Sequence, residues 1–270
     1  MKLAISNIAW KKEEDPQIIE IMHDLGISAL EVAPTRFWEE PLKASAEEVL
    51  KVRRFWEEQG IGIVAMQALL FGRPELTIFE DPRIREQTLQ YLFEIIRLAK
   101  NLGCGVLVFG SPKNRKVRGM PKEEVRRIAG DFFGRLGDES AKHGVWFCLE
   151  PNPPEYGCDF ITTTQEGIDF VKDTNKDGLG LNFDLGGATM NKEPLEQVLP
   201  KAAPVMCHFH ISAPNLIPIT EGEVNHNLAA KLLKEIGYNR FVSIEMRSSE
   251  SNLDRVRESS QFVKDTYTIK

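Results

Sequence analysis

The sequence lacks the features that would place the protein in a membrane or on a nucleic acid. None of its apolar runs approaches the ~18–20 residues that a membrane-spanning helix needs. Its 34 basic residues stand against 40 acidic ones, a net charge of −6, whereas nucleic-acid binding relies on an excess of Lys and Arg. The amino-terminal apolar stretch is too short for a secretory signal. We therefore expect a cytoplasmic protein that binds neither membrane nor nucleic acid.

Cysteine pairs and glycine-rich loops are also missing. The spread-out cysteines include no CxxC pair, so we expect reduced thiols rather than a zinc ribbon or a disulfide scaffold. Residues 6–10, which follow the first expected strand, contain no glycine, so neither a GxGxxG motif nor a P-loop is present there. This absence disfavours the alternative fold, a doubly wound open sheet. The four cysteines are Cys104, Cys148, Cys158 and Cys207.

One unit recurs along the chain: an amphipathic helix that ends in glycine, followed by a short apolar strand. A glycine just after a helix takes the left-handed conformation that other residues resist, and an almost wholly apolar strand is typical of a parallel strand buried on both faces. Five such glycines are Gly26, Gly60, Gly103, Gly144 and Gly237. Three further strands without this signature are expected at Leu3–Ser6, Leu179–Phe183 and Val205–Ile211.

Helices are predicted between these strands because apolar residues recur at helical spacing over 46–59, 84–101, 122–142 and 227–235. Eight strand–helix units in this chain would each span about 34 residues, which matches a barrel of alternating strands and helices. No linker or low-complexity segment divides the chain. The sequence thus predicts an α/β fold, a (β/α)8 TIM barrel forming a single domain over residues 1–270.

Four consecutive expected strands end in a side chain that can bind a metal: Glu150, Asp184, His210 and Glu245. The carboxyl ends of the strands meet at one face of such a barrel. A carboxylate at the mouth of an apolar core is costly unless a cation meets it, and no Lys or Arg recurs at these strand ends. We therefore predict one divalent metal ion, with Mn²⁺ favoured and Mg²⁺, Co²⁺ or Zn²⁺ compatible with the oxygen-rich set.

Each of these residues also has an ordinary structural interpretation. A lone acid at a strand end is more often a helix cap or an ion-pair partner, and a lone histidine is often a satisfied core residue. Four such residues on successive strands favour the metal site. His208 and His210 share one face of their strand. We assign His210 as the ligand because it lies nearer the barrel mouth, and we expect His208 to pack or hydrogen-bond one layer deeper.

Six further residues are predicted to contact the substrate. The segment 111–118 is the strongly basic stretch at the expected active-site face; its Lys113 and Arg115 would suit a phosphate, a carboxylate or a nucleotide diphosphate, although a solvated loop is the alternative. Two others lie two residues past a metal ligand and point the same way, and two close the second and third strands, where they would bind hydroxyl groups. These four are Asn152, Arg247, Glu31 and Gln67.

The motifs around the four metal-binding candidates resemble those of the xylose isomerase-like TIM barrels, which include sugar phosphate isomerases/epimerases and ketose 3-epimerases. The motifs are Leu-Glu-Pro-Asn at 149–152, Asn-Phe-Asp at 182–184, His-Phe-His at 208–210 and Ser-Ile-Glu-Met at 243–246. The resemblance runs from Lys2 to about Phe262. It implies that Glu150 and Glu245 bind the metal and act as the acid–base pair, while the metal chelates the carbonyl and adjacent hydroxyl oxygens of the substrate.

Several positions depart from the patterns of that superfamily. Gly187, Leu216 and Tyr156 stand where ketose 3-epimerases usually carry His, Arg and Glu, so we do not expect free fructose or tagatose to be the substrate. The abasic-site endonuclease branch holds three zinc ions with additional histidines. Those histidines are missing here at residues 31–33, 67–68 and 186–187, so nuclease activity is not expected.

The expected function is a metal-dependent isomerase or epimerase of a sugar or sugar derivative, acting through an enediolate. A carboxylate alone is too weak to remove a proton beside a carbonyl, whereas a Lewis acid on the carbonyl oxygen stabilises the enediolate. A lyase or dehydratase similar to the inosose or dehydroshikimate dehydratases begins with the same step and stays open, as do a non-catalytic sugar-binding barrel and a hydrolase. Analogy with the family suggests a homodimer or homotetramer.

Overall fold

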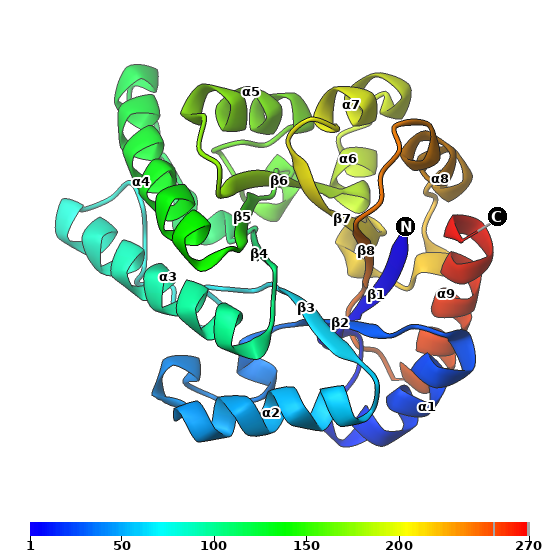
Figure 1. Cartoon of the computed structure of the whole chain (residues 1–270). Coiled ribbons are helices and arrows are strands. Elements are labelled where there is room, and N and C mark those ends of the chain that lie inside the picture. The colour runs from blue at the N-terminus through cyan, green and yellow to red at the C-terminus, as the bar shows by residue number, and fades with distance from the viewer. Residues whose placement is uncertain (251, 269–270) are drawn as a thin grey trace.

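Eight parallel strands close into a barrel in a computed structural model of the chain, which describes residues 1–250 and 252–268. Each strand pairs with the next in sequence order, and β8 pairs with β1. The helices form a ring around the strands (Figure 1). The predicted (β/α)8 barrel is therefore confirmed. The strands are β1 Lys2–Ser6, β2 Ala29–Val32, β3 Gly62–Met66, β4 Val106–Phe109, β5 Trp146–Leu149, β6 Leu179–Asp184, β7 Met206–Ser212 and β8 Phe241–Glu245.

The helices lie between the strands, and the last one follows β8. The four predicted from apolar spacing are present with ends shifted by at most a few residues, as α2, α3, α4 and α8. The helices are α1 Asp15–Leu25, α2 Ala46–Glu58, α3 Pro82–Leu102, α4 Lys122–His143, α5 Thr164–Thr174, α6 Leu185–Met190, α7 Leu195–Ala202, α8 His226–Glu235 and α9 Asn252–Tyr267.

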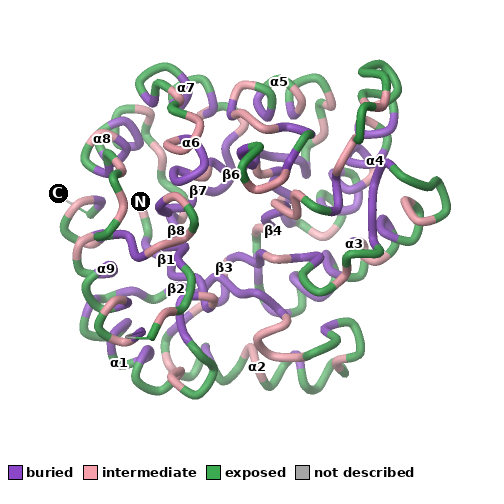
Figure 2. The backbone as a smooth tube through the Cα atoms, turned by 180° about the vertical axis from the view of Figure 1, so that it is seen from behind, coloured by how far each residue is buried: buried purple, intermediate pink, exposed green. Residues whose placement is uncertain are grey.

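Local sequence explains where these helices begin and end. The Asp81 side chain accepts hydrogen bonds from the backbone nitrogens of Arg83 and Ile84 and so caps α3. Ser45 and Glu48 form a capping box at the start of α2. The five glycines that the sequence pattern places after helices all have positive φ. The strands are buried and the outer faces of the helices are exposed (Figure 2), as expected of a barrel wrapped by amphipathic helices.

The pairing of neighbouring strands is irregular at two places, both close to the carboxyl ends of the strands. The register of β2 with β3 shifts between Leu30 and Glu31. The register of β6 with β7 shifts after Leu181, so that Asp184 comes to lie opposite His210. Bulges of this kind re-aim side chains and occur often beside active sites. The first shift changes the alignment of the end of β2 with β3, and the second aligns the ends of β6 and β7.

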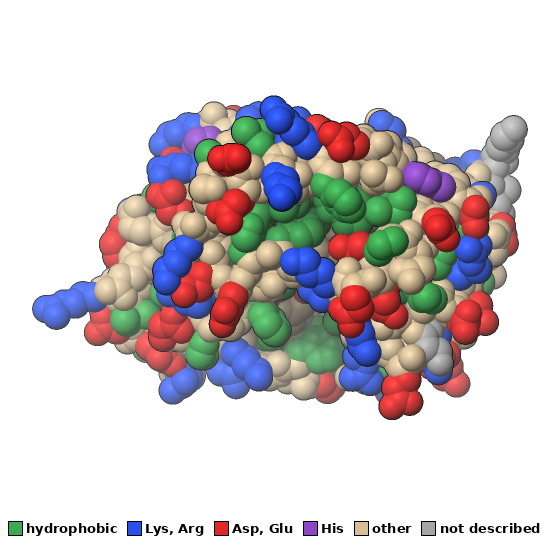
Figure 3. Space-filling model, turned by 90° about the horizontal axis from the view of Figure 1, so that it is seen from below, with side chains coloured by type: hydrophobic (Ala, Val, Ile, Leu, Met, Phe, Trp, Pro, Cys, Tyr) green, Lys and Arg blue, Asp and Glu red, His purple; other side chains and the backbone are tan. Residues whose placement is uncertain are grey.

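No helix within the described ranges has both the length and the apolar character to cross a bilayer. Figure 3 shows Lys and Arg side chains interspersed with Asp and Glu over the face that it presents, with hydrophobic side chains gathered in a hollow. All four cysteines are buried and unpaired.

His226 at the start of α8 makes the fold sensitive to acid. Its imidazole is buried, its Nδ1 lies 3.0 Å from the Tyr267 hydroxyl, and burial lowers its pKa from 6.5 to about 4. As the pH falls below 6.5, His226 of the unfolded chain binds a proton, whereas the buried imidazole of the folded chain does not. The folded state therefore keeps its full stability above pH 6.5 and loses part of it as the pH falls towards 4. The loss amounts to about 3 kcal/mol at most.

We predict that His226→Gln, which cannot titrate in this range, weakens the acid dependence of stability. Urea unfolding at pH 7 and pH 4.5 measures it: the fall in unfolding free energy between the two values should be smaller in the variant than in the wild type. Equal falls in the two proteins would show that His226 does not carry this dependence.

Candidate metal and active site

The carboxyl ends of the strands surround a cavity of about 400 Å³. All four predicted metal ligands line it: Glu150, Asp184, His210 and Glu245. They come from or directly follow four neighbouring strands, β5 to β8. Parallel strands end at one level, so residues far apart in sequence meet there.

The imidazole of His210 lies at the centre of this group. Its Nδ1 is 3.1 Å from Oε2 of Glu245 and 3.3 Å from Oε2 of Glu150. Asp184, His210 and Glu245 each offer a ligand atom within 4.8 Å of the others'. Although Nδ1 is fully buried, no hydrogen bond to it forms within residues 1–250 and 252–268. A buried nitrogen lone pair among three carboxylates is a fitting donor set for a divalent cation.

Amide side chains hold the two glutamates in place. Asn152 donates to Oε1 of Glu150 at 2.7 Å, and Asn182 donates to its Oε2 at 2.8 Å. Burial alone would raise the pKa of Glu150, but its contacts with the imidazole and with the two amides bring it below its ordinary value. Gln67 donates to Oε1 of Glu245 at 2.7 Å. Amide donors stabilise the ionised form of a carboxylate, which is the form that binds a metal or accepts a proton.

Asp184 is held by different partners. The backbone nitrogen of Gly187 donates to its Oδ1 at 2.5 Å, and the Ser212 hydroxyl donates to its Oδ2. It thus also caps α6, so the ordinary interpretation of an acid at a strand end holds here beside the metal-binding one. Burial, and then the charges of Glu150 and Glu245, raise its pKa to about 7.

These carboxylates repel one another in the absence of a cation. Burial, and then the anionic charges of Glu150 and Glu245, favour the protonated form of Asp184 and so raise its pKa. Burial lowers the pKa of His210, but Glu245 and Glu31 raise it well above its ordinary value. A dication between the carboxylates would remove the repulsion that raises the pKa of Asp184. Asp184, His210 and Glu245 could therefore hold a divalent metal ion, and Glu150 lies beside them, 3.3 Å from the same imidazole nitrogen.

Strained backbone gathers around the cavity. Eight non-glycine residues of the described chain have positive φ, and four of them line the cavity: Ala68, Ser111, Asn215 and Leu216. A Cβ atom makes this conformation costly because it crowds the backbone, and such residues cluster at functional sites. The backbone around the cavity is thus held in a shape that local preferences alone would not produce.

The predicted substrate-contacting residues divide into two groups. Gln67, Asn152 and Arg247 line the cavity, and Arg247 is the one Lys or Arg among its lining residues. The other three do not line it. Lys113 is exposed on the surface, whereas Arg115 and Glu31 have no exposed surface at all.

Arg115 lies behind the cavity wall. Its Nη2 donates to the carbonyl oxygen of Glu150 at 2.7 Å and to Oδ1 of Asn152 at 3.0 Å. Asn152 in turn donates to Glu150, so the guanidinium supports the carboxylate indirectly. The expectation that Arg115 grips a substrate anion therefore fits its position poorly, because the head group faces protein rather than the cavity.

Sequence reasoning missed Asn182 and Ser212, which contact the metal-binding carboxylates. They could have been predicted from the alternation of side chains along a strand, because residues two positions apart lie on the same face. Asn182 precedes Asp184 by two residues, and Ser212 follows His210 by two, so each shares a strand face with a predicted ligand. Tyr156 was noted only as a departure from a family pattern. It lines the cavity, and its hydroxyl accepts a hydrogen bond from the backbone of Asn215 at 2.8 Å.

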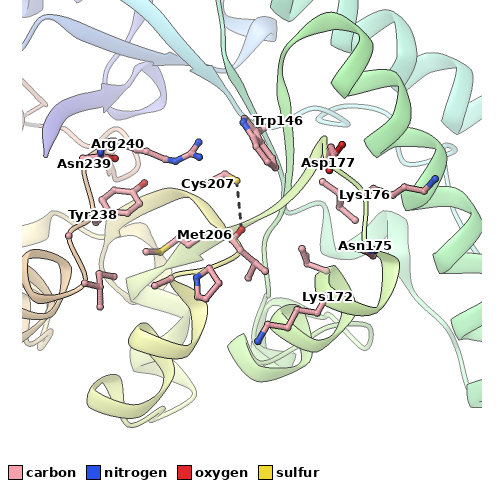
Figure 4. A pocket seen from close by; sticks show the side chains of 17 residues that line it. Trp146, Lys172, Asn175, Lys176, Asp177, Met206, Cys207, Tyr238, Asn239 and Arg240 are labelled. Carbon is pink, nitrogen blue, oxygen red and sulfur yellow. Dashed lines mark hydrogen bonds between the residues drawn. The ribbon is translucent and has the colours of Figure 1, made fainter.

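A second cavity of about 420 Å³ lies at the amino-terminal ends of the strands. Figure 4 shows the side chains that line it, among them Cys207, Trp146 and Arg240, whose guanidinium lies 5.5 Å from the centre of the Trp146 ring. No metal-binding cluster of the described residues lies there. Function in barrels of this class resides at the opposite end, so we place the candidate active site in the first cavity.

The family follows from comparison with known proteins. The family model of the xylose isomerase-like TIM barrel matches residues 19–266. The chain belongs to this family.

One relative shares part of the sequence of this chain, and several solved structures share its fold. An uncharacterised protein of Methanocaldococcus jannaschii is 31% identical over 178 residues, which are 62% of this chain and 59% of the relative. D-Psicose 3-epimerase from Clostridium cellulolyticum H10, solved with D-tagatose, superposes with a TM-score of 0.81 at 19% identity, covering 99% of each chain. L-ribulose 3-epimerase gives 0.81 at 16% identity over 99% of this chain and 95% of its own. The IolI protein, solved with a zinc atom, gives 0.75 at 19% identity over 99% of each chain.

The geometry explains one departure from the ketose 3-epimerase pattern. A Cβ atom at Gly187 would lie 2.9 Å from Oδ1 of Asp184 and 3.3 Å from Cδ of Pro153. No side chain fits there without displacing the Asp184 carboxylate. The wall of the cavity next to Asp184 is thus formed by backbone at Gly187, and a histidine there would shift the Asp184 carboxylate from its present position.

A similar close approach at Gly110 yields a prediction. A Cβ atom there would lie 2.8 Å from Oε1 of Glu150 and 3.4 Å from Oδ1 of Asn152. We expect Gly110→Ala to displace the Glu150 carboxylate and to lower the affinity for Mn²⁺ by about 10-fold or more. Calorimetric titration measures this. Gly130→Ala on α4 is the control, because nothing lies within 4 Å of its new Cβ. Equal affinities in the two variants would contradict the predicted position of Glu150.

Proposed function

We propose that the protein is a divalent-metal-dependent isomerase or epimerase of a sugar or sugar derivative, with Glu150 and Glu245 as the groups that transfer the proton. The observation that carries the proposal is the buried Nδ1 of His210, which faces both glutamates without a hydrogen-bond partner in the described part of the chain. Kinship with the xylose isomerase-like barrels and the likeness in fold to D-psicose and L-ribulose 3-epimerases support it.

The metal would be held by Glu150, Asp184, His210 and Glu245, and we propose Mn²⁺ because the set is rich in carboxylate oxygens. When bound, such an ion would act as a Lewis acid that polarises the substrate carbonyl and makes the adjacent C–H more acidic.

Glu150 suits the role of a base. Its hydrogen bonds from Asn152 and Asn182 favour the ionised form, and its pKa lies below the ordinary value. Glu245 flanks the same imidazole nitrogen and is held by Gln67. Two carboxylates on different strands around one cavity can remove a proton from one face of a carbon and return one to the other face, which is epimerisation. A single one acting on one face gives isomerisation.

Arg247 indicates that the substrate carries an anion. It lines the cavity two residues beyond Glu245, and none of the described carboxylates pairs with its guanidinium within 4.0 Å. Arg247 is exposed and lies beyond the end of β8, so its guanidinium is accessible to a phosphate or carboxylate of a bound substrate. We therefore propose a sugar phosphate or a sugar acid rather than a neutral ketose.

Hydrogen exchange at carbon tests the proposed reaction. Incubation of the protein and Mn²⁺ in D₂O with ketoses, sugar phosphates, sugar acids and inosose should place deuterium on carbon in at least one of them, detectable by NMR. Glu150→Gln should reduce this exchange by at least about 1,000-fold, because it removes the base and weakens the metal site. Glu155→Gln, an exposed glutamate of the same loop, is the matched control and should leave the rate unchanged.

The outcomes separate the alternatives. Exchange accompanied by loss of water would identify a lyase acting through the same proton abstraction. Binding of a sugar in the presence of Mn²⁺ with no exchange at carbon would contradict the proposed catalysis and indicate a binding protein. Full exchange by Glu150→Gln would show that another group is the base.

Arg247→Ala tests the proposed anion. Loss of a charge-assisted hydrogen bond should raise KM for an anionic substrate by about 10-fold or more and leave kcat nearly unchanged, because the contact is made equally in the ground state and the transition state. Lys113→Ala is the control, since Lys113 is an exposed cation outside the cavity. Equal KM values for wild type and Arg247→Ala would show that Arg247 does not contact the anion.

A further inference from the structure

Glu31 lies at the end of β2 with no exposed surface, and each of its carboxylate oxygens faces a different imidazole. Oε1 is 3.1 Å from Nε2 of His210, and Oε2 is 3.2 Å from Nε2 of His208. The two histidine rings are 5.2 Å apart and nearly perpendicular, at 82°. Glu31 does not line the cavity, so its position does not support the predicted contact with substrate hydroxyls.

We propose that Glu31 is a positioning residue: it holds the Nε2–H form of His210 and thereby leaves Nδ1 free to bind the metal. An ionised carboxylate only accepts hydrogen bonds. Both imidazoles must therefore present an N–H from Nε2. In the neutral imidazole of His210, which is the form that binds a metal, this leaves Nδ1 as the atom with a lone pair, and Nδ1 points at Glu150 and Glu245.

The geometry explains why one carboxylate serves two histidines. His208 and His210 alternate along β7, so both rings point to the barrel interior and lie in successive layers. Glu31 reaches them from β2, on the other side of the barrel interior. A carboxylate behind a metal-binding histidine fixes the orientation of the ring and makes it a stronger donor. His208 donates a hydrogen bond to the second oxygen of Glu31, and this bond keeps the carboxylate from rotating away from His210.

The same three side chains offer another interpretation, a second metal site, because their ligand atoms lie within 4.8 Å of one another. They supply only three ligands, whereas a closed structural site needs four. All three are at most 1% exposed, which leaves no evident room for a water molecule as the fourth. We therefore assign the contacts of Glu31 with His208 and His210 as hydrogen bonds. The experiment must also be able to detect a second bound metal.

The inference rests on the metal site of the proposed function, and the wild-type protein tests both. Titration of metal-free protein with Zn²⁺ should give one ion per chain. The ¹⁵N spectrum of labelled histidines in the zinc-loaded protein should show His210 bound through Nδ1 and protonated at Nε2. Two ions per chain, or binding through Nε2, would overturn the role of Glu31 and leave the proposed function standing. No bound ion would overturn both.

Glu31→Gln separates positioning from packing. Glutamine has nearly the same shape, but its amide offers one acceptor atom and one donor atom, so it cannot accept from both imidazoles. We expect the Zn²⁺ affinity to fall by about 10- to 100-fold, and part of the His210 population to shift its proton to Nδ1 in the ¹⁵N spectrum. The melting temperature should change little. Parallel losses of affinity and melting temperature, with His210 still protonated at Nε2, would indicate a merely structural residue.

A matched control is available outside the site. Glu139 on α4 is also nearly buried, and its carboxylate lies 3.2 Å from Nε2 of His143. Glu139→Gln makes the same chemical change at a glutamate–histidine contact far from the cavity, so it should leave the Zn²⁺ affinity unchanged. If Glu31→Gln and Glu139→Gln gave the same affinity as the wild type, the positioning role would be excluded.

Discussion

The burial of three carboxylates around one imidazole nitrogen is the constraint on which the rest of the site depends. Such a cluster is unfavourable by itself, because each charge loses hydration and repels the others. The raised pKa of Asp184 is the direct consequence of that burial and repulsion. The cluster lies at the mouth of the barrel at a cost in stability that a bound dication would offset. The proposed binding of a cation would therefore account for the arrangement.

The surroundings of the cluster are organised to support it. Amides of Asn152, Asn182 and Gln67 orient the two glutamates. Gly110 and Gly187 leave space for carboxylates that any larger residue would displace. The shifts of register after Leu30 and Leu181 bring the ends of neighbouring strands to a common level. Each of these features lowers the freedom of a metal-binding side chain, which is how a barrel presents a rigid site on strand ends while its loops vary.

The fold was predictable because the barrel repeats one unit, and a glycine after a helix followed by an apolar strand is a strong local signal. The residues that close strands were predictable for the same reason, since the carboxyl ends of parallel strands must share one face. The positions of Arg115 and Glu31 relative to the cavity were predicted less accurately than those of the strand-end residues. Both were expected in contact with the substrate, yet the direction of Arg115 depends on the loop after β4, and that of Glu31 on an irregular strand pairing. Neither loop shape nor register can be derived from periodicity.

The most direct test of the account is anomalous X-ray diffraction from crystals of the protein soaked in Mn²⁺. The account predicts a single strong anomalous peak per chain, bounded by carboxylate oxygens of Glu150, Asp184 and Glu245 and by Nδ1 of His210, at about 2.0–2.2 Å from each ligand atom. A peak elsewhere, or none at full soaking concentration, would contradict the claim that these four side chains form a metal site.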